Sequence, residues 1–215
     1  MREDAPLDWC VPQYRLMRAL ELSRIPKIYL HANRYNYVVD DENRKVYTER
    51  ILPVLEDVVG VVDRGTNFIF FHENTGTGKT FNACVILNHF IYKTCVTKRF
   101  DFETPLGLFV EYPTLMDDLR YRRDDEDVVL LMEQIRETPL LLLDDVGAGT
   151  MSDYTRQQTY MILNYRFSNR KSTIITTNMG LKQLERPEYL DKRNMSRILS
   201  NAVGAPVGGR DRRLG

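Results

Sequence analysis

A short glycine-rich segment holds the residues with the clearest chemical potential in this chain. Residues 73–80 read ENTGTGKT, which contains most of the phosphate-binding pattern G-x-x-x-x-G-K-[ST]. In such a loop the backbone N–H groups surround phosphate oxygens, the lysine reaches the terminal phosphates, and the Ser or Thr hydroxyl ligates Mg²⁺. Lys79 and Thr80 occupy those two positions, whereas Glu73 stands where the first glycine belongs. The segment therefore predicts a site for a polyphosphate with a modified first residue.

Glu73 bears on how strongly such a site would bind. A carboxylate that points toward the phosphates would oppose them by an energy on the order of a few kcal/mol at low effective dielectric, whereas one that points outward is screened by water. The first loop position also lies farther from the terminal phosphate than Lys79. We interpret the loop as a modified, weaker nucleotide site. Its predicted nucleotide-binding residues are Asn74, Thr75, Gly76, Thr77, Gly78, Lys79, Thr80 and Phe81.

Two adjacent carboxylates end the apolar run LLLLDDVG at residues 140–147. Acidic side chains at the end of a buried strand are costly unless a cation or water meets them. We therefore predict that Asp144 and Thr80 hold Mg²⁺ and that Asp145 polarises an attacking water. Asn178 follows the run IITT and would place a neutral amide near the terminal phosphate or that water. The alternatives are that the aspartates cap a helix and that Asn178 is only a turn residue.

Four short apolar runs are predicted to form the strands that position these side chains. Continuous apolar runs bounded by turn residues are typical of strands buried on both faces of a parallel sheet. Helical spacing fills the intervals, so the glycine loop lies between a strand and a helix. The sequence therefore predicts a three-layer α/β fold with a parallel sheet. The predicted strands cover residues 67–71, 107–111, 139–145 and 172–178.

Residue spacing also predicts helices and the sides of them that face the core. Helical stretches are expected within residues 12–26, 45–59 and 152–168 and directly after the glycine loop. The predicted core-facing residues are Phe81, Cys84, Val85 and Tyr92 behind the loop, and Tyr154, Met161 and Tyr165 in the third stretch. The charged run RYRRDDED at residues 120–127 is interpreted as a solvated helix end or loop.

Composition limits the class of protein. A length of 215 residues with 43% hydrophobic content suits one globular domain with a sizeable core. The 30 basic and 30 acidic residues balance, so no global field draws the protein toward nucleic acid. Cys10, Cys84 and Cys95 form no CxxC pair, which argues against zinc and against a disulfide framework. Without an apolar leader or a run of roughly 18 apolar residues, we expect a soluble, cytoplasmic protein with no membrane partner.

The two ends of the chain differ from its middle. We divide the chain into an N-terminal extension, residues 1–24, and one domain, residues 25–215. An apolar stripe in the extension can dock on a partner or pack on the protein's own core. Only 37 residues follow Asn178, too few for both a last strand and a large helical subdomain. The stripe consists of Leu16, Met17, Leu20 and Leu22.

The order of these elements resembles the AAA+ ATPases of the bacterial and phage helicase-loader group, the DnaC, DnaI and IstB type. The resemblance runs from about Ile25 to the C-terminus, and its most specific part is LDDVGA followed by NYRFSNRKSTIITTN. The shorter matching segments are SRIPKIYLHA, TGTGKTF, FVEYPTLMDDL, LDKRNMSRIL and VGGRDRRL. The resemblance implies an AAA+ P-loop domain with a short N-terminal extension and a minimal C-terminal lid.

The resemblance also implies roles for single residues. Asn178 would be the sensor-1 residue, Arg197 the arginine finger and Arg213 the second sensor. ATP and Mg²⁺ would be the cofactors, and ATP hydrolysis to ADP and phosphate the reaction. Asp145 departs from the glutamate of many AAA+ proteins, and its shorter side chain would hold water less well. That difference suits a slow ATPase that depends on assembly.

Several partners are implied by the same resemblance: a hexameric replicative helicase, single-stranded DNA, and further copies of the chain in a ring or spiral. Residues 112–123, YPTLMDDLRYRR, combine aromatic and positive side chains, the pairing that contacts bases and phosphates. An ordinary amphipathic helix is the alternative, with Asp117 and Asp118 offsetting the charge. The basic cluster at residues 92–100 suits DNA equally well. The side chains proposed for the first surface are Tyr112, Arg120, Arg122 and Arg123.

Three functions compete at this point. The first is an ATP-dependent helicase loader acting in DNA replication. The second is a transposition regulator of the IstB type, which a stable preference for duplex over single-stranded DNA would favour. The third, motivated by Glu73, is a nucleotide-binding interaction protein with little turnover, which would bind ATP without DNA-stimulated hydrolysis.

Overall fold

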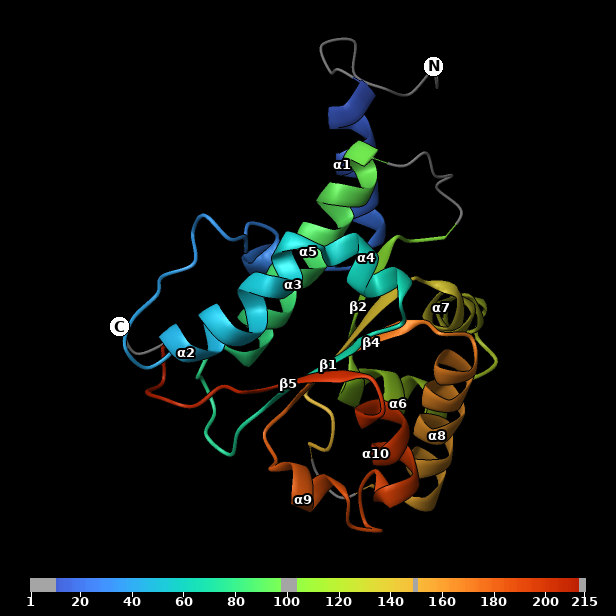
Figure 1. Cartoon of the computed structure of the whole chain (residues 1–215). Helices are drawn as coiled ribbons and strands as arrows, with labels where there is room; N and C mark the ends of the chain where they lie inside the picture. The colour runs from blue at the N-terminus through green and yellow to red at the C-terminus, as the bar shows by residue number, and fades with distance from the viewer. Residues whose placement is uncertain (1–10, 98–103, 149–150, 213–215) are drawn as a thin grey trace.

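The computed structural model describes residues 11–97, 104–148 and 151–212 of the chain. Its centre is a five-stranded parallel sheet with the strand order β2-β3-β4-β1-β5 (Figure 1). Helices lie on both faces of the sheet, which confirms the predicted three-layer α/β architecture. The strands are β1 (Asn67–Phe71), β2 (Gly107–Glu111), β3 (Leu140–Asp144), β4 (Ser172–Thr177) and β5 (Ala202–Pro206).

The first four strands coincide with the predicted apolar runs because both of their faces are buried. Side chains alternate between the two faces of a strand. Phe68 and Phe70 belong to one hydrophobic cluster, whereas Ile69 belongs to the cluster on the other side of the sheet. Leu141 and Leu142 divide in the same way along β3. Burial on both faces explains the continuous apolar runs of β1 to β3, whereas β4 buries four Ser and Thr side chains beside Ile174 and Ile175.

Two layers of helices cover the sheet (Figure 1). One layer contains α1 (Val11–Leu22), α3 (Leu52–Glu56), α4 (Val58–Asp63) and α5 (Lys79–Thr97). The other contains α6 (Tyr112–Tyr121), α7 (Glu126–Glu137), α8 (Asp153–Ser168), α9 (Leu181–Leu184) and α10 (Asp191–Leu199). Three short helices precede the first strand: the 3-10 helix η1 (Lys27–Tyr29), α2 (Arg44–Val46) and the π-helix η2 (Tyr47–Ile51). No helix in the described part of the chain has the length and apolar character needed to span a bilayer.

The predicted helices are present, but their core-facing sides were predicted only in part. Cys84 and Val85 are buried as expected, whereas Tyr92 and Met161 are 49% and 45% exposed. Polar side chains with internal partners take core positions on α8, as when the Thr159 hydroxyl donates to the Thr155 carbonyl. The spacing of apolar residues alone cannot identify a core-facing side of a helix that contains buried polar residues. The buried residues of α8 are Thr155, Thr159, Ile162, Leu163 and Arg166.

The strand β5 was not predicted. It pairs in parallel with β1 at the edge of the sheet, and most of its residues are only partly buried. An edge strand with one covered side does not need a continuous apolar run, so AVGAP carries little strand signal. The chain after Asn178 thus supplies a last strand and, among the described residues, only the short helices α9 and α10.

The N-terminal helix α1 packs on the protein's own core. Ala19 is 1% exposed, and Leu16 and Leu20 lie partly buried against the same cluster. Met17 is 39% exposed on α1. One side of the predicted apolar stripe is therefore used internally, and a docking role for the other side stays a prediction, as does the domain boundary after residue 24.

Arg166 is the largest side chain that the core buries completely. Its Nη1 donates to the carbonyls of Ile135 and Thr138 at 2.7 and 3.0 Å, and its Nη2 donates to that of Ser172. Its Nε donates to the Thr173 hydroxyl at 3.0 Å. Burial lowers the pKa of Arg166 to about 9. The guanidinium thus joins the C-terminal end of α7 to the start of β4.

We expect Arg166→Met to destabilise the fold by about 3–5 kcal/mol, because methionine leaves several buried carbonyl groups without a donor. The free energy of unfolding from urea titration measures the change. Arg123→Met is the matched control, since the Arg123 side chain is 70% exposed. A loss below about 1 kcal/mol in the Arg166 variant would contradict the structural role, because surface changes alone reach that size.

Candidate nucleotide-binding site

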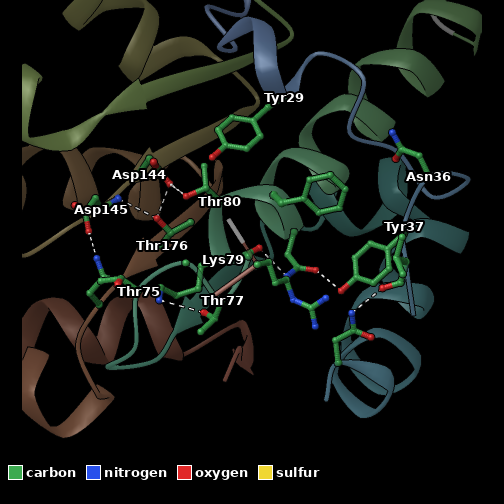
Figure 2. Close-up of a pocket in the computed structure, with 18 residues that line it drawn as sticks. Tyr29, Asn36, Tyr37, Thr75, Thr77, Lys79, Thr80, Asp144, Asp145 and Thr176 are labelled. Atoms are coloured by element: carbon green, nitrogen blue, oxygen red, sulfur yellow. Dashed lines mark hydrogen bonds between the residues drawn. The ribbon is translucent and has the colours of Figure 1, made fainter. Parts of the chain in front are cut away.

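A cavity of about 590 Å³ lies where β1, β3 and β4 end and α5 begins (Figure 2). Carboxyl ends of parallel strands meet at one edge of a sheet, which explains why separate motifs converge here. The cavity is large enough for a nucleotide-sized ligand. The predicted residues that line it are Thr75, Gly76, Thr77, Gly78, Lys79, Thr80, Phe81, Asp144, Asp145 and Asn178.

The glycines of the loop are required by its backbone. Gly76 and Gly78 have φ angles of 70° and 97°, a region that other residues rarely adopt. A β-carbon at Gly76 would also collide with the carboxylate of Asp211. The loop then enters α5 at Lys79, and the first N–H groups of a helix have no acceptor within the helix. Such a loop can place amides around phosphate oxygens.

Lys79 folds back across the loop. Its Nζ donates to the backbone carbonyls of Asn74 and His72 at 2.6 and 3.2 Å, and Lys79 as a whole is 6% exposed. These contacts hold the ammonium group in the lining of the cavity. Asn74 contributes its carbonyl to this arrangement and does not itself line the cavity.

Asp144 accepts two hydroxyl hydrogen bonds. Thr80 donates to its Oδ1 at 2.9 Å and Thr176 donates to the same oxygen at 2.6 Å. Burial raises the pKa of Asp144, and the bonds from Thr176 and Thr80 offset part of that effect. Mg²⁺ prefers oxygen ligands and is usually held by one or two protein groups plus phosphates and waters. The Thr80 hydroxyl and the Asp144 carboxylate are therefore a donor set that fits this ion.

Asp145 is oriented by Thr176 at the end of β4 and by Asn178, which directly follows that strand. The Asn178 Nδ2 donates to Asp145 Oδ1 at 2.7 Å, and the Asp145 N–H donates to the Thr176 hydroxyl at 2.9 Å. Asp145 has a φ of 60°, an uncommon value for a residue other than glycine. The turn brings its carboxylate into the lining beside Asp144 rather than along the strand. A carboxylate fixed in this way can polarise a water molecule.

The comparisons with known proteins agree with this geometry. The profile of the family described as IstB-like ATP binding protein matches residues 12–201. The chain belongs to this IstB-like ATP-binding family.

Relatives and solved structures place this family member among AAA+ P-loop proteins. The replicative helicase loader DnaI of Bacillus subtilis is 25% identical over 156 residues, which are 67% of this chain and 47% of that protein. The chain thus spans about half of that relative. A crystal structure of the DnaC helicase loader is similar to this chain, at 26% identity and a TM-score of 0.66. The match covers 84% of this chain and 99% of the DnaC chain.

A more distant structure is the replication initiator DnaA bound to AMPPCP and single-stranded DNA. It has a TM-score of 0.61 and 20% identity, and the match covers 88% of this chain and 53% of that chain. At this identity the likeness concerns the fold. The predicted AAA+ P-loop fold is therefore confirmed for this member of the IstB-like family.

The sequence did not predict the far wall of the cavity, which comes from residues 36–43. In Figure 2, Tyr37 and Asn36 lie at the end opposite Asp144 and Thr176. The Tyr37 hydroxyl donates to Asn82 Oδ1 at 2.5 Å, and burial raises the pKa of Tyr37 to about 12. The segment HANRYNYVVDD is rich in aromatic and polar residues, and this composition was the only indication in the sequence that it could line a site.

Arg212 also lines the cavity and was not predicted to do so. Its guanidinium makes two contacts with Asp40, at 2.8 and 3.1 Å, and its backbone N–H donates to the Gly76 carbonyl at 2.9 Å. The C-terminal segment thereby contacts both the phosphate-binding loop and the far wall. The predicted second sensor, Arg213, lies outside the described residues.

Glu73 does not enter the cavity. Glu73 is exposed and absent from the cavity lining. Its carboxylate lies close to the loop after β4, where a β-carbon built on Gly180 would be 3.8 Å from Glu73 Oε1. The outward alternative for this side chain therefore fits the structure better than the inward one. A water-screened carboxylate in this position has little effect on phosphates.

We expect Glu73→Gly and Glu73→Gln to bind ATP as tightly as the parent or slightly more tightly, within about 0.5 kcal/mol. Glutamine removes the charge without adding backbone freedom, so the pair separates the two effects. Calorimetric titration with ATP and Mg²⁺ is the measurement. A marked loss of affinity in both variants would show that the carboxylate has a positive role in the site.

Arg197 lies outside the cavity of its own chain. It is in the last turn of α10, where its guanidinium carbon is 4.9 Å from the centre of the Tyr160 ring and its Nη2 donates to the Tyr160 hydroxyl at 3.4 Å. Arg193 lies 5.2 Å over the same ring. Arg197 is therefore not part of the cavity lining, and its role as an arginine finger stays a prediction.

The proposed DNA surface on α6 is partly wrong. Tyr112 is 2% exposed and its hydroxyl is 2.5 Å from that of Thr159, so its ring cannot stack on a base. Tyr121, at 74% exposure, is the aromatic residue that this helix presents. Arg122 forms ion pairs with three carboxylates, which reduce its attraction for phosphates. They belong to Asp118, Asp125 and Asp127.

The other proposed DNA surface, residues 92–100, is described only in part. Tyr92 and Lys93 are exposed on α5, and residues 98–100 lie outside the described part of the chain. The charged run at residues 120–127 confirms its simpler interpretation, because it spans the end of α6, a loop and the start of α7.

Proposed function

We propose that this protein is an ATP-dependent helicase loader that acts in cytoplasmic DNA replication and hydrolyses ATP slowly, when assembled. The observation that carries the proposal is the convergence of the Lys79 loop, the Thr80–Asp144 pair and the Asp145–Asn178 pair on one cavity. Membership of an ATP-binding family and similarity to two helicase loaders support it.

The site residues have distinct roles in this proposal. Lys79 and the amides of the glycine loop bind the phosphates of ATP, and Thr80 and Asp144 hold Mg²⁺. When bound, Mg²⁺ neutralises charge that develops on the terminal phosphates. Asp145 accepts a hydrogen bond from the attacking water and orients it, while Asn178 keeps the carboxylate in place.

Assembly completes the site in this proposal. Copies of the chain join into a ring or spiral, and Arg197 of one copy reaches the ATP of the next. Arg213 contacts the nucleotide of its own chain as the second sensor. Such a division makes hydrolysis depend on assembly, because the stabilising cation is missing from an isolated subunit.

A loading experiment tests the proposal. The 215-residue chain is mixed with the hexameric replicative helicase of its own organism and with circular single-stranded DNA, in ATP or in ADP. We expect ATP to support a complex of chain and helicase, hydrolysis to release the chain, and helicase to remain on the circle. Absence of any complex with the helicase in both nucleotides would refute the loader function.

A transposition regulator of the IstB type is the second candidate, and the family description favours it. Both functions use the same nucleotide site, so the DNA must separate them. A loader is expected to prefer single-stranded DNA, whereas a regulator that assembles on target DNA would prefer duplex. Competition between duplex and single-stranded oligonucleotides of equal length decides between the two.

A further inference from the structure

A second cavity, of about 440 Å³, lies at the edge of the sheet opposite the nucleotide cavity. It is formed where β1, β4 and β5 begin and where α8 ends. The two cavities lie at opposite ends of the parallel strands, so they are separated by the length of a strand. Its lining residues are Arg64, Gly65, Asn67, Phe167, Ser168, Arg170, Lys171, Ser200 and Asn201.

The lining of this second cavity is positively charged. It includes three basic residues and no acidic one. Arg170 is exposed and pairs with no carboxylate within the described part of the chain. Lys171 is already engaged, because its Nζ lies 3.2 Å from Glu137 Oε2 and donates to the Glu137 carbonyl at 2.7 Å. Arg64 pairs with Asp57 at 3.1 Å, but both side chains are about 60% exposed, and an exposed pair of this kind contributes only about 0–1 kcal/mol. A hollow with excess positive charge attracts anions.

The basic turn is held in place before any ligand binds. Arg170 has a φ of 51°, and its backbone N–H donates to the Phe167 carbonyl at 3.1 Å. A β-carbon on Gly65 would lie 2.7 Å from the Arg170 carbonyl oxygen, so only glycine allows the two segments this close approach. The next residue is fixed as well, since the Lys171 N–H donates to the Arg166 carbonyl at 2.9 Å. A turn whose backbone is already ordered loses less entropy when it binds a ligand.

An aromatic ring stands beside these charges. Phe167 is 46% exposed in the lining of the cavity. Positive side chains that follow the phosphate backbone, together with an aromatic ring on which a base stacks, are the pairing used by single-strand-binding proteins. The volume also lies in the range of small-ligand sites, which suits one nucleotide unit better than a duplex.

We infer that this second cavity binds one nucleotide unit of single-stranded DNA, with the phosphate on Arg170 and the base against Phe167. The inference rests on the proposed function, because it assigns the DNA binding of that function to a particular surface. It differs from the α6 surface, where Arg122 is surrounded by carboxylates.

The test uses fluorescence anisotropy of a labelled twenty-residue oligothymidylate with the 215-residue chain, at several salt concentrations. We expect Arg170→Glu and Phe167→Ala each to weaken binding about tenfold. Arg170→Glu is also expected to reduce the slope of log affinity against log salt by roughly 0.7, the value for one phosphate contact on a single strand. Arg50→Glu is the matched control, because Arg50 is exposed and does not line this cavity, and it is expected to change neither quantity.

Two further measurements keep the outcomes separate. Unchanged affinity and salt slope in both cavity variants would overturn the inference, whatever the helicase experiment gives. Free thymidine monophosphate, titrated into the Lys79→Ala variant, tests the other source of the same chemistry. Binding of the free nucleotide that is lost in Arg170→Glu, without oligonucleotide binding, would also overturn the single-strand assignment. Loss of helicase association with Arg170-dependent DNA binding intact would refute the loader function and leave this site standing.

Discussion

Lys79→Ala is expected to abolish tight ATP binding, with an affinity at least about 100-fold lower, or about 2.7 kcal/mol. The reason is the position of the ammonium group, which is buried in the cavity lining and held by two loop carbonyls. Alanine removes the one strong positive charge that the loop directs at terminal phosphates. Calorimetric titration with ATP and Mg²⁺ measures the loss.

The control for this prediction is Lys93→Ala, which removes an exposed lysine from the same helix. It is expected to bind ATP like the parent. Because the Lys79 ammonium also links two loop carbonyls, the thermal unfolding of both variants must be compared. Unchanged ATP affinity in a folded Lys79→Ala protein would remove the basis of the whole functional proposal.

The nucleotide loop and the acidic strand end were readable from the sequence because their chemistry is local. Gly78, Lys79 and Thr80 form a contiguous string between a strand and a helix. The parallel topology then brings the carboxyl ends of the strands to the same edge of the sheet. The Asp145–Asn178 hydrogen bond follows from that topology, since β3 and β4 are neighbours whose carboxyl ends meet. Motifs at strand ends can thus be placed together without coordinates.

The far wall of the nucleotide cavity could not be predicted in this way. Tyr37 reaches Asn82 from 45 positions earlier in the chain, and Arg212 reaches Asp40 from 172 positions later. Neither pair follows a secondary-structure period, so no spacing rule connects them. The same holds for Arg166, whose partners include the backbone carbonyls of Ile135 and Thr138.

The solvent exposure of single aromatic side chains could not be predicted from the sequence either. Tyr112 begins a helix directly after β2, and an aromatic residue there can face either the core or a ligand. Its hydroxyl finds Thr159 on the neighbouring helix α8, which stabilises the buried position. Phe167 shows the opposite outcome at the end of α8, where the turn to β4 leaves its ring half exposed.

Arg197→Ala is expected to leave ATP binding nearly intact and to lower turnover by up to about 10³-fold, the lower end of the effect of arginine fingers. Its guanidinium is stacked on Tyr160 and does not line the cavity of its own chain. Direct loss of ATP affinity is therefore not expected. Phosphate release and ATP-dependent assembly, followed by light scattering, are the measurements.

A mixing experiment distinguishes a finger from a structural arginine. Lys79→Ala subunits lack a working loop and Arg197→Ala subunits lack the finger, so a mixed interface can join an intact loop to an intact finger. Because such an interface restores the full set of charges around one ATP, the mixture is expected to regain activity that neither variant has alone. If the mixture stays inactive while both variants fold and associate, or if Arg197→Ala alone hydrolyses normally, the finger assignment is wrong. Arg193 is then the next candidate, because it shares the Tyr160 ring and is exposed.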